Sequence, residues 1–131
     1  MQGALDAFHS INDMRLRNVI QVYEYDTLAI LVLEFDTASL FLTAVANDDS
    51  LDVSTTEPEH KSSLKFEGAN EVKVWSDVLG KRFGWGWVTV NQQGYRDGAL
   101  LSFEGIVPQI FVKVIASTLK FGTVQMTPTL K

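Results

Sequence analysis

The feature that most constrains the fold is the run at residues 28–35, LAILVLEF, which is apolar on both sides of an extended chain. Successive side chains on a strand point to opposite faces, and here both sets are mainly aliphatic. The two sets are Leu28, Ile30 and Val32 on one face and Ala29, Leu31, Leu33 and Phe35 on the other. Central strands that are covered on both sides have this composition. We therefore expect a helix or a second sheet on each face.

The rest of the chain repeats this β-prone pattern between turn-forming residues. Runs rich in β-branched and aromatic residues, bounded by Asp, Asn, Gly or Pro, are typical of short strands. Such runs predict further strands at 18–25, 39–46, 51–56, 71–75, 85–93 and 99–104. The run 109–126 is long for one strand, so we expect a break near Ala116-Ser117 or at Gly122.

Helical patterns are short. Leu5, Phe8 and Ile11 recur every three residues, which predicts an amphipathic helix near the N-terminus. A helical turn is also predicted within 76–83, with Ser76 as its N-cap. The segment 56–70 contains a proline, serines and mixed charge, and we expect it to be a loop.

These elements predict one α+β domain spanning residues 1–131. Its main element would be an antiparallel sheet of seven or eight strands, with the short N-terminal helix packed on one face. A small β-barrel is the alternative. The chain is 131 residues long, 46% hydrophobic and 21% charged, which agrees with a soluble globular protein of this size.

The sequence lacks the signals that mark several functional classes of protein. The chain has no cysteine, and its N-terminus lacks the basic and apolar regions of a signal peptide. No apolar run approaches the ~20 residues that span a bilayer. His9 and His60 lie in unlike contexts, without zinc-ligand spacing. We expect a cytoplasmic protein with no membrane contact and no metal or other cofactor. The sequence offers no catalytic residues, which favours a non-enzymatic role and leaves weak activity open for the small-molecule alternative below.

Charge is distributed unevenly along the chain. Residues 24–59 contain nine acidic residues and no Lys or Arg, whereas residues 66–131 contain seven basic and five acidic residues. The net charge of −5 argues against a nucleic-acid partner, because phosphate contacts need a basic footprint. The acidic half could favour a basic protein partner. Alternatively, its carboxylates keep strand ends soluble and unpaired.

The stretch 80–98, GKRFGWGWVTVNQQGYRDG, concentrates tryptophan, glycine and amides. On a strand, Trp85, Trp87, Thr89 and Asn91 would share one face. Aromatic rings beside hydrogen-bonding groups bind sugars, nucleobases or proteins. The competing interpretation, which the sequence favours, is that both tryptophans are core residues packed under a helix or a second sheet, and the N-terminal helix could provide that cover. Asp97-Gly98 is predicted as a hairpin turn.

The polar residues after this strand have two interpretations as well. Asn91, Gln92 and Gln93 favour a structural role in a turn or bulge over recognition. If the stretch is functional, its ligand- or partner-binding residues would be Trp85, Trp87, Asn91, Gln92, Tyr95 and Arg96.

The run WSDVLGKRFGWGWVTVNQQGYRDGALLSFEG, followed by PQIFVKVIAS, resembles a family of small uncharacterised bacterial proteins. The resemblance covers roughly residues 75–117. That family has no assigned activity, so the resemblance implies no catalytic residue.

Two functional hypotheses follow. The first is a non-enzymatic binding or protein-interaction domain, with an immunity-type protein that neutralises a toxin as one version. Its contact surface would be the aromatic strand 85–91 and the adjoining turn. The alternative is a barrel-like protein that binds a small molecule in a pocket on the Trp85/Trp87 face. A homodimer formed through a strand edge is a third possibility.

Overall fold

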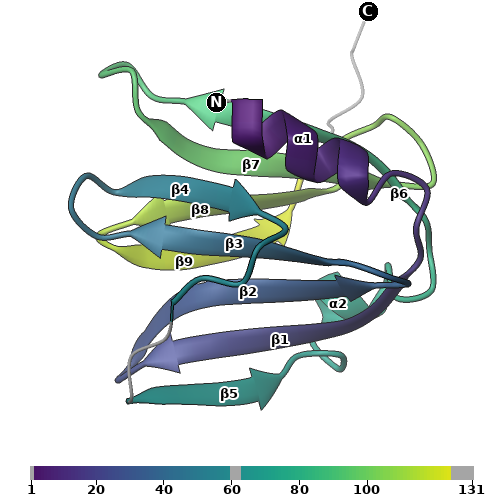
Figure 1. Ribbon diagram of the computed structural model, residues 1–131, viewed down its shortest axis with the longest axis horizontal. Coiled ribbons are helices and arrows are strands. Elements are labelled where there is room, and N and C mark those ends of the chain that lie inside the picture. The colour runs from purple at the N-terminus through teal and green to yellow at the C-terminus, as the bar shows by residue number, and fades with distance from the viewer. Residues whose placement is uncertain (1, 60–62, 125–131) are drawn as a thin grey trace, which may run out of the picture.

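A computed structural model describes residues 2–59 and 63–124, which form nine strands and two helices (Figure 1). The helices are α1 (Gln2–Ser10) and α2 (Lys73–Ser76). The strands are β1 (Leu16–Glu24), β2 (Thr27–Phe35), β3 (Ser39–Val45), β4 (Ser50–Ser54), β5 (Leu64–Gly68), β6 (Phe83–Val90), β7 (Arg96–Phe103), β8 (Ile110–Ile115) and β9 (Thr118–Thr123).

The strands form two antiparallel sheets, ordered β4-β3-β2-β1-β5 and β6-β7-β8-β9. We call them the first and second sheets. Within the described residues neither sheet closes on itself, so the mainly antiparallel prediction is confirmed and the barrel alternative is not observed. The predicted number of seven or eight strands is too low. The extra strand is β5, within the segment 56–70 that was predicted to be a loop.

The two sheets lie face to face and are offset from one another, and helices extend the layers at both ends (Figure 1). α1 lies beside β4 and over the inner side of β6, while α2 lies beside β9 on the inner side of the first sheet. The core between the layers includes Leu31, Leu33, Leu42, Leu101 and Val112, all fully buried. β2 is central in the first sheet, as its two apolar faces predicted.

α1 is held to the sandwich by its apolar side. Phe8 is 5% exposed, and its ring stacks on Phe83 with centroids 5.8 Å apart. A Cβ on Gly86 would lie 2.6 Å from the Phe8 ring, so glycine is needed for this close approach. The expected N-terminal helix therefore packs on a sheet face, and that face is the inner one.

The strand predicted at 71–75 is wrong. This segment contains α2, and Trp75 at its end is fully buried against Phe121 of β9, with ring centroids 5.2 Å apart. The helical turn expected to begin at Ser76 instead ends there. Burial of one large ring has overridden the β propensity of the flanking valines.

The turns are partly as predicted. The long run 109–126 breaks at Ala116 and Ser117, which have φ values of 52° and 65° and connect β8 to β9. Gly122 lies within β9 and makes no break. The predicted Asp97-Gly98 turn is wrong, because both residues are in β7 and the hairpin turn lies at residues 91–95.

The outer face of the first sheet carries a second, smaller apolar cluster. Val22, Ile30 and Val32 are 0–8% exposed, and Ile20 and Phe41 pack against them. A hollow of about 220 Å³ lies over this cluster, with Pro58, Phe66 and the carboxylate-bearing Glu34 and Glu57 among its lining residues. Both faces of β2 are therefore buried, but residues such as Pro58 and Phe66 lie over the outer face in place of the expected helix or second sheet. A register shift in the pairing with β1 also exchanges two side chains, so that Leu28 lies in the main core and Ala29 packs on the outer cluster.

No helix in the parts of the chain that the structure describes is both long and apolar enough to cross a membrane.

Candidate functional site

The most distinctive surface is the outer face of the second sheet, which we call the aromatic face. It is defined by Trp85, Trp87, Thr89, Leu100, Phe111, Lys113 and Lys120. Trp87, Leu100, Phe111 and Gly122 are directly opposite one another across all four strands. These residues make one continuous apolar row. Sequence analysis expected the tryptophans on the face opposite Val88, and the register confirms this.

The tryptophan rings are at the surface. Trp85 is 52% exposed and Trp87 is half-buried, and their ring centroids are 6.5 Å apart at an angle of 52°. The preferred sequence interpretation, in which both are core residues under a helix or second sheet, is wrong. The helix α1 lies on the other side of β6, where Phe8 contacts the position of Gly86. An aromatic pair at the surface of an open sheet is typical of a protein-binding surface.

A second row of residues runs parallel to the aromatic row. Thr89, Gly98, Lys113 and Lys120 are opposite one another on β6, β7, β8 and β9. Gly98 is tightly enclosed: a Cβ there would lie 2.7 Å from the Val112 carbonyl oxygen and 2.8 Å from Thr89 Oγ1. A shallow hollow of about 400 Å³ includes Thr89, Leu100, Phe111 and Lys113 in its lining. The hollow therefore has Leu100 and Phe111 on one side, and Lys113, Thr89 and the Asp97 carboxylate among the residues on the other.

Gly122 allows the Phe111 ring to lie close to the backbone of β9. The Phe111 ring occupies the place where a side chain on residue 122 would project, since a Cβ there would lie 2.7 Å from the ring. The ring therefore lies down across β9 and covers its backbone. Any larger residue at position 122 would push Phe111 away from the sheet.

The turn residues of the predicted site have mixed roles. Asn91 Oδ1 accepts hydrogen bonds from the backbone N–H groups of Gln93 and Tyr95, at 2.9 and 3.2 Å, which makes it a turn-stabilising residue. Gln92 is exposed, and Tyr95 is 45% exposed. Arg96 begins β7 opposite Val90. The structure thus brings Trp85 and Trp87 together on one face, with Asn91, Gln92, Tyr95 and Arg96 at the hairpin tip.

Leu100, Phe111, Lys113 and Lys120 were missed by sequence analysis. Leu100 lies in an apolar run that is typical of a buried strand. The other three lie in strands that are distant in sequence from the tryptophans. The available signal was the alternation in β8, where Phe111, Lys113 and Ile115 share the face opposite buried Ile110, Val112 and Val114. The strand order needed to place that face beside Trp87 is not readable from alternation alone.

The loop after β7 packs against β6 at Gly84. Ser102, opposite Trp85, is fully buried and its hydroxyl donates a 2.6 Å hydrogen bond to the Gly105 carbonyl oxygen. A Cβ on Gly84 would overlap the same carbonyl group. Ile106 and Val107, in the same loop, are 71% and 58% exposed.

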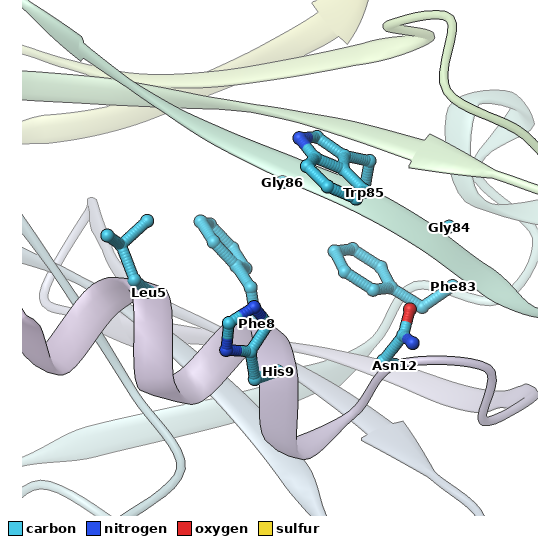
Figure 2. A pocket seen from close by; sticks show the side chains of 8 residues that line it. All are labelled: Leu5, Phe8, His9, Asn12, Phe83, Gly84, Trp85 and Gly86. Atoms are coloured by element: carbon cyan, nitrogen blue, oxygen red, sulfur yellow. The ribbon is translucent and has the colours of Figure 1, made fainter.

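A groove of about 210 Å³ lies between α1 and the free edge of β6 (Figure 2). Figure 2 shows Leu5, Phe8 and His9 of α1, with Asn12 beyond it, facing the strand that carries Phe83, Gly84, Trp85 and Gly86. Its lining is mainly apolar, with an imidazole and an amide on the helix side. Trp85 borders both this groove and the aromatic face.

The carboxyl group of Asp36, whose pKa is shifted, does not belong to the aromatic face or to the groove. Asp36 accepts hydrogen bonds from the backbone N–H of Arg15 at 3.0 Å and from Arg17 Nε at 2.6 Å, and these lower the pKa of its carboxyl group. The pair ties the end of β2 to β1. Within residues 2–59 and 63–124 there is no cluster of three or more potential metal ligands, and His60 lies outside the described residues.

Comparison with known proteins places the chain in a family. The model of the family of unknown function DUF6334 matches residues 1–127, so the chain belongs to that family. This confirms the expected relationship to an uncharacterised domain family and extends it from the C-terminal half to nearly the whole chain. No curated protein and no solved structure matches.

Proposed function

We propose that the protein is a binding domain that recognises a partner protein through the aromatic face. The observation that carries this proposal is the row Trp87, Leu100 and Phe111, which leaves two aromatic rings and an aliphatic side chain partly exposed on an open sheet. Contiguous exposed apolar surface is costly in a monomer and marks interaction sites. Tryptophan is also the residue most enriched among interface hot spots.

The shape of the face favours a protein over a small molecule. A small-molecule site on the tryptophan face would be concave and would bury polar groups such as Asn91 with atoms left to bind a ligand. Instead, Asn91 Oδ1 is used by two backbone N–H groups of its own turn. The face is an open sheet surface, and its hollow lies beside the row formed by Trp87, Leu100 and Phe111. Such a surface suits a protein partner, which can bury a large area of its own surface against it.

Site-specific photo-crosslinking tests the proposal. A photoreactive phenylalanine analogue replaces Trp87 or, as the control, Asp52, an exposed β4 residue on the outer face of the first sheet. The expected result is a partner that is captured from position 87 and not from position 52. After purification, this partner should bind the wild-type protein. Its affinity for Trp87→Ala should be at least about thirtyfold lower, which is the effect expected at a hot-spot residue.

Two results would contradict this function. Capture from both positions would indicate nonspecific contact. Binding of the purified partner that is unchanged by Trp87→Ala would place the interface elsewhere. Asp52→Ala is the control in the binding assay, because it lies on the opposite side of the sandwich and should leave affinity unchanged.

A second candidate function is small-molecule binding in the groove between α1 and β6. The observation that favours it is the combination of apolar Phe8 and Trp85 with the polar His9 and Asn12 around one space of about 210 Å³. This volume is below the roughly 300–1,000 Å³ of typical ligand pockets, so only a small ligand fits. A fragment that binds the wild type but not the Asn12→Ala variant, and tolerates Trp87→Ala, would support this alternative.

A further inference from the structure

We infer that the partner of the aromatic face is an acidic protein segment. Its carboxylates would lie against Lys113 and Lys120, and an apolar side chain would lie on the row formed by Trp87, Leu100 and Phe111. This inference rests on the proposed function and adds the chemistry of the partner to it.

The first observation is a pair of opposed lysines. Lys113 and Lys120 are direct cross-strand partners on β8 and β9, and both are exposed. Neither makes an ion pair within the described residues. Like charges directly opposite each other destabilise a sheet, because their side chains project side by side. An anionic group placed between the two ammonium groups would relieve this repulsion.

The second observation is the distance between charge and apolar surface. The lysine row is two residues along the strands from the aromatic row, which corresponds to roughly 7 Å. The hollow lies between Leu100 and Phe111 of the aromatic row and Thr89 and Lys113 of the lysine row. An extended segment with an apolar residue and an acid two positions apart has the same spacing. It could fill the hollow and reach the lysines together.

The third observation is where the chain keeps its own acids. The nine acidic residues between positions 24 and 59 belong to the strands and connections of the first sheet. The aromatic face belongs entirely to the second sheet, where Asp97 is the acid lining the hollow and its Oδ1 accepts a hydrogen bond from the Thr89 hydroxyl. The sequence hypothesis of a basic partner drawn to the acidic half therefore concerns a different surface from the tryptophans. Charge complementarity at the aromatic face favours an acidic partner.

A nucleic acid is a weaker fit for the same cations. Binding to a phosphate backbone depends on several Lys or Arg contacts, whereas the two rows provide two lysines. The whole chain carries a net charge of −5, which would repel an extended polyanion. A short acidic segment with an apolar anchor requires only the local pair of charges. We therefore assign the partner to the protein class.

Selection from a displayed library of random dodecapeptides tests the inference. Peptides enriched on the wild-type protein are synthesised with a fluorophore, and their affinities are measured by anisotropy for the wild type and for Trp87→Ala. We expect the Trp87-dependent peptides to combine two or more acidic residues with an aromatic or aliphatic residue. Their affinity should fall about tenfold in the Lys113→Gln/Lys120→Gln variant and should weaken as salt is raised.

A matched variant controls for net charge. Lys65→Gln/Lys73→Gln also removes two positive charges, from β5 and α2, which lie outside the aromatic face. It should retain wild-type affinity. Thermal melts of all variants check folding, and both lysine pairs are exposed, so the variants should fold normally.

The outcomes separate this inference from the proposed function. Trp87-dependent peptides that are neutral or basic, or equal losses in both double-lysine variants, would overturn the acidic partner and leave the binding face in place. If no selected peptide depends on Trp87, the binding face itself is wrong. Trp87-dependent binding of a labelled twelve-residue oligothymidine as tight as the best peptide would overturn the protein class. A Trp87-dependent dimer in sedimentation would make a second copy the occupant.

Discussion

The outer faces of the two sheets both carry apolar side chains, but only one of them is covered. On the first sheet, Val22, Ile30 and Val32 are nearly inaccessible, and Pro58 and Phe66 lie around the hollow over them. On the second sheet, the row formed by Trp87, Leu100 and Phe111 is partly exposed, and Trp85 beside it is half exposed. The difference shows that apolar composition alone does not tell a covered sheet face from an open one. The open face is the one that we propose to bind a partner.

The largest expected effect comes from truncating the same residue type on the two outer faces. Ile30→Ala on the first sheet should lower the free energy of unfolding by about 2–5 kcal/mol, because Ile30 is 5% exposed and leaves a cavity. Ile115→Ala on the second sheet should cost under about 1 kcal/mol, because Ile115 is already 49% exposed. Denaturant titration of both variants measures this. Equal losses would remove the distinction between the faces.

Glycine substitution in the two edge strands should give the next effect. Gly84→Ala in β6 should destabilise by roughly 1–3 kcal/mol, since its Cβ would overlap the Gly105 carbonyl group and displace the loop. Gly68→Ala in β5 is the control, because nothing lies within 4 Å of its Cβ position. The control should be neutral or slightly stabilising, since alanine reduces the entropy of the unfolded chain. Thermal melting of both variants measures these changes in stability. A Gly84→Ala variant as stable as the wild type would contradict the described position of the loop.

Tryptophan fluorescence should distinguish the buried tryptophan from those at the surface. Trp75 is fully buried whereas Trp85 is 52% exposed. The Trp85→Phe variant should therefore emit further to the blue and resist acrylamide more than the wild type. Trp75→Phe should shift emission to the red and increase quenching. A blue-shifted, quencher-resistant Trp75→Phe spectrum would mean that the aromatic face is covered in solution, by a second copy or otherwise.

The smallest effect should come from the pH dependence of one ion pair. Hydrogen bonds from Arg15 and Arg17 lower the pKa of Asp36 in the folded state. A lowered folded pKa stabilises the protein above the unfolded value of about 3.9, and this contribution is lost as pH falls through the folded pKa. Asp36→Asn should therefore reduce stability slightly at pH 7 and have less effect at pH 2.5. Urea midpoints at both pH values test this, and an equal difference at each would contradict the charge assignment.

Much of the first sheet was predictable because its strands are adjacent in sequence. The predicted runs 18–25, 28–35 and 39–46 closely match β1, β2 and β3, whose connections are short. The errors occurred where tertiary contacts override local preference. Residues 71–75 were predicted to be a strand from their valines, but burial of Trp75 between the layers requires the helical turn of α2. Asp97-Gly98 resembles a turn, but Gly98 is a strand residue enclosed by Val112 and Thr89.

The sequence by itself determined which side of β6 carries the tryptophans, because side chains alternate strictly along a strand. It also determined that β2 would be buried on both faces and that Asn91 would serve a turn. Only the tertiary structure decided that α1 covers the opposite side of β6, that Leu100 and Phe111 continue the Trp87 row, and that Lys113 faces Lys120. These relations depend on strand order and register between distant segments. Local periodicity specifies which way each side chain points, but the partner strand is chosen by the packing of the whole core.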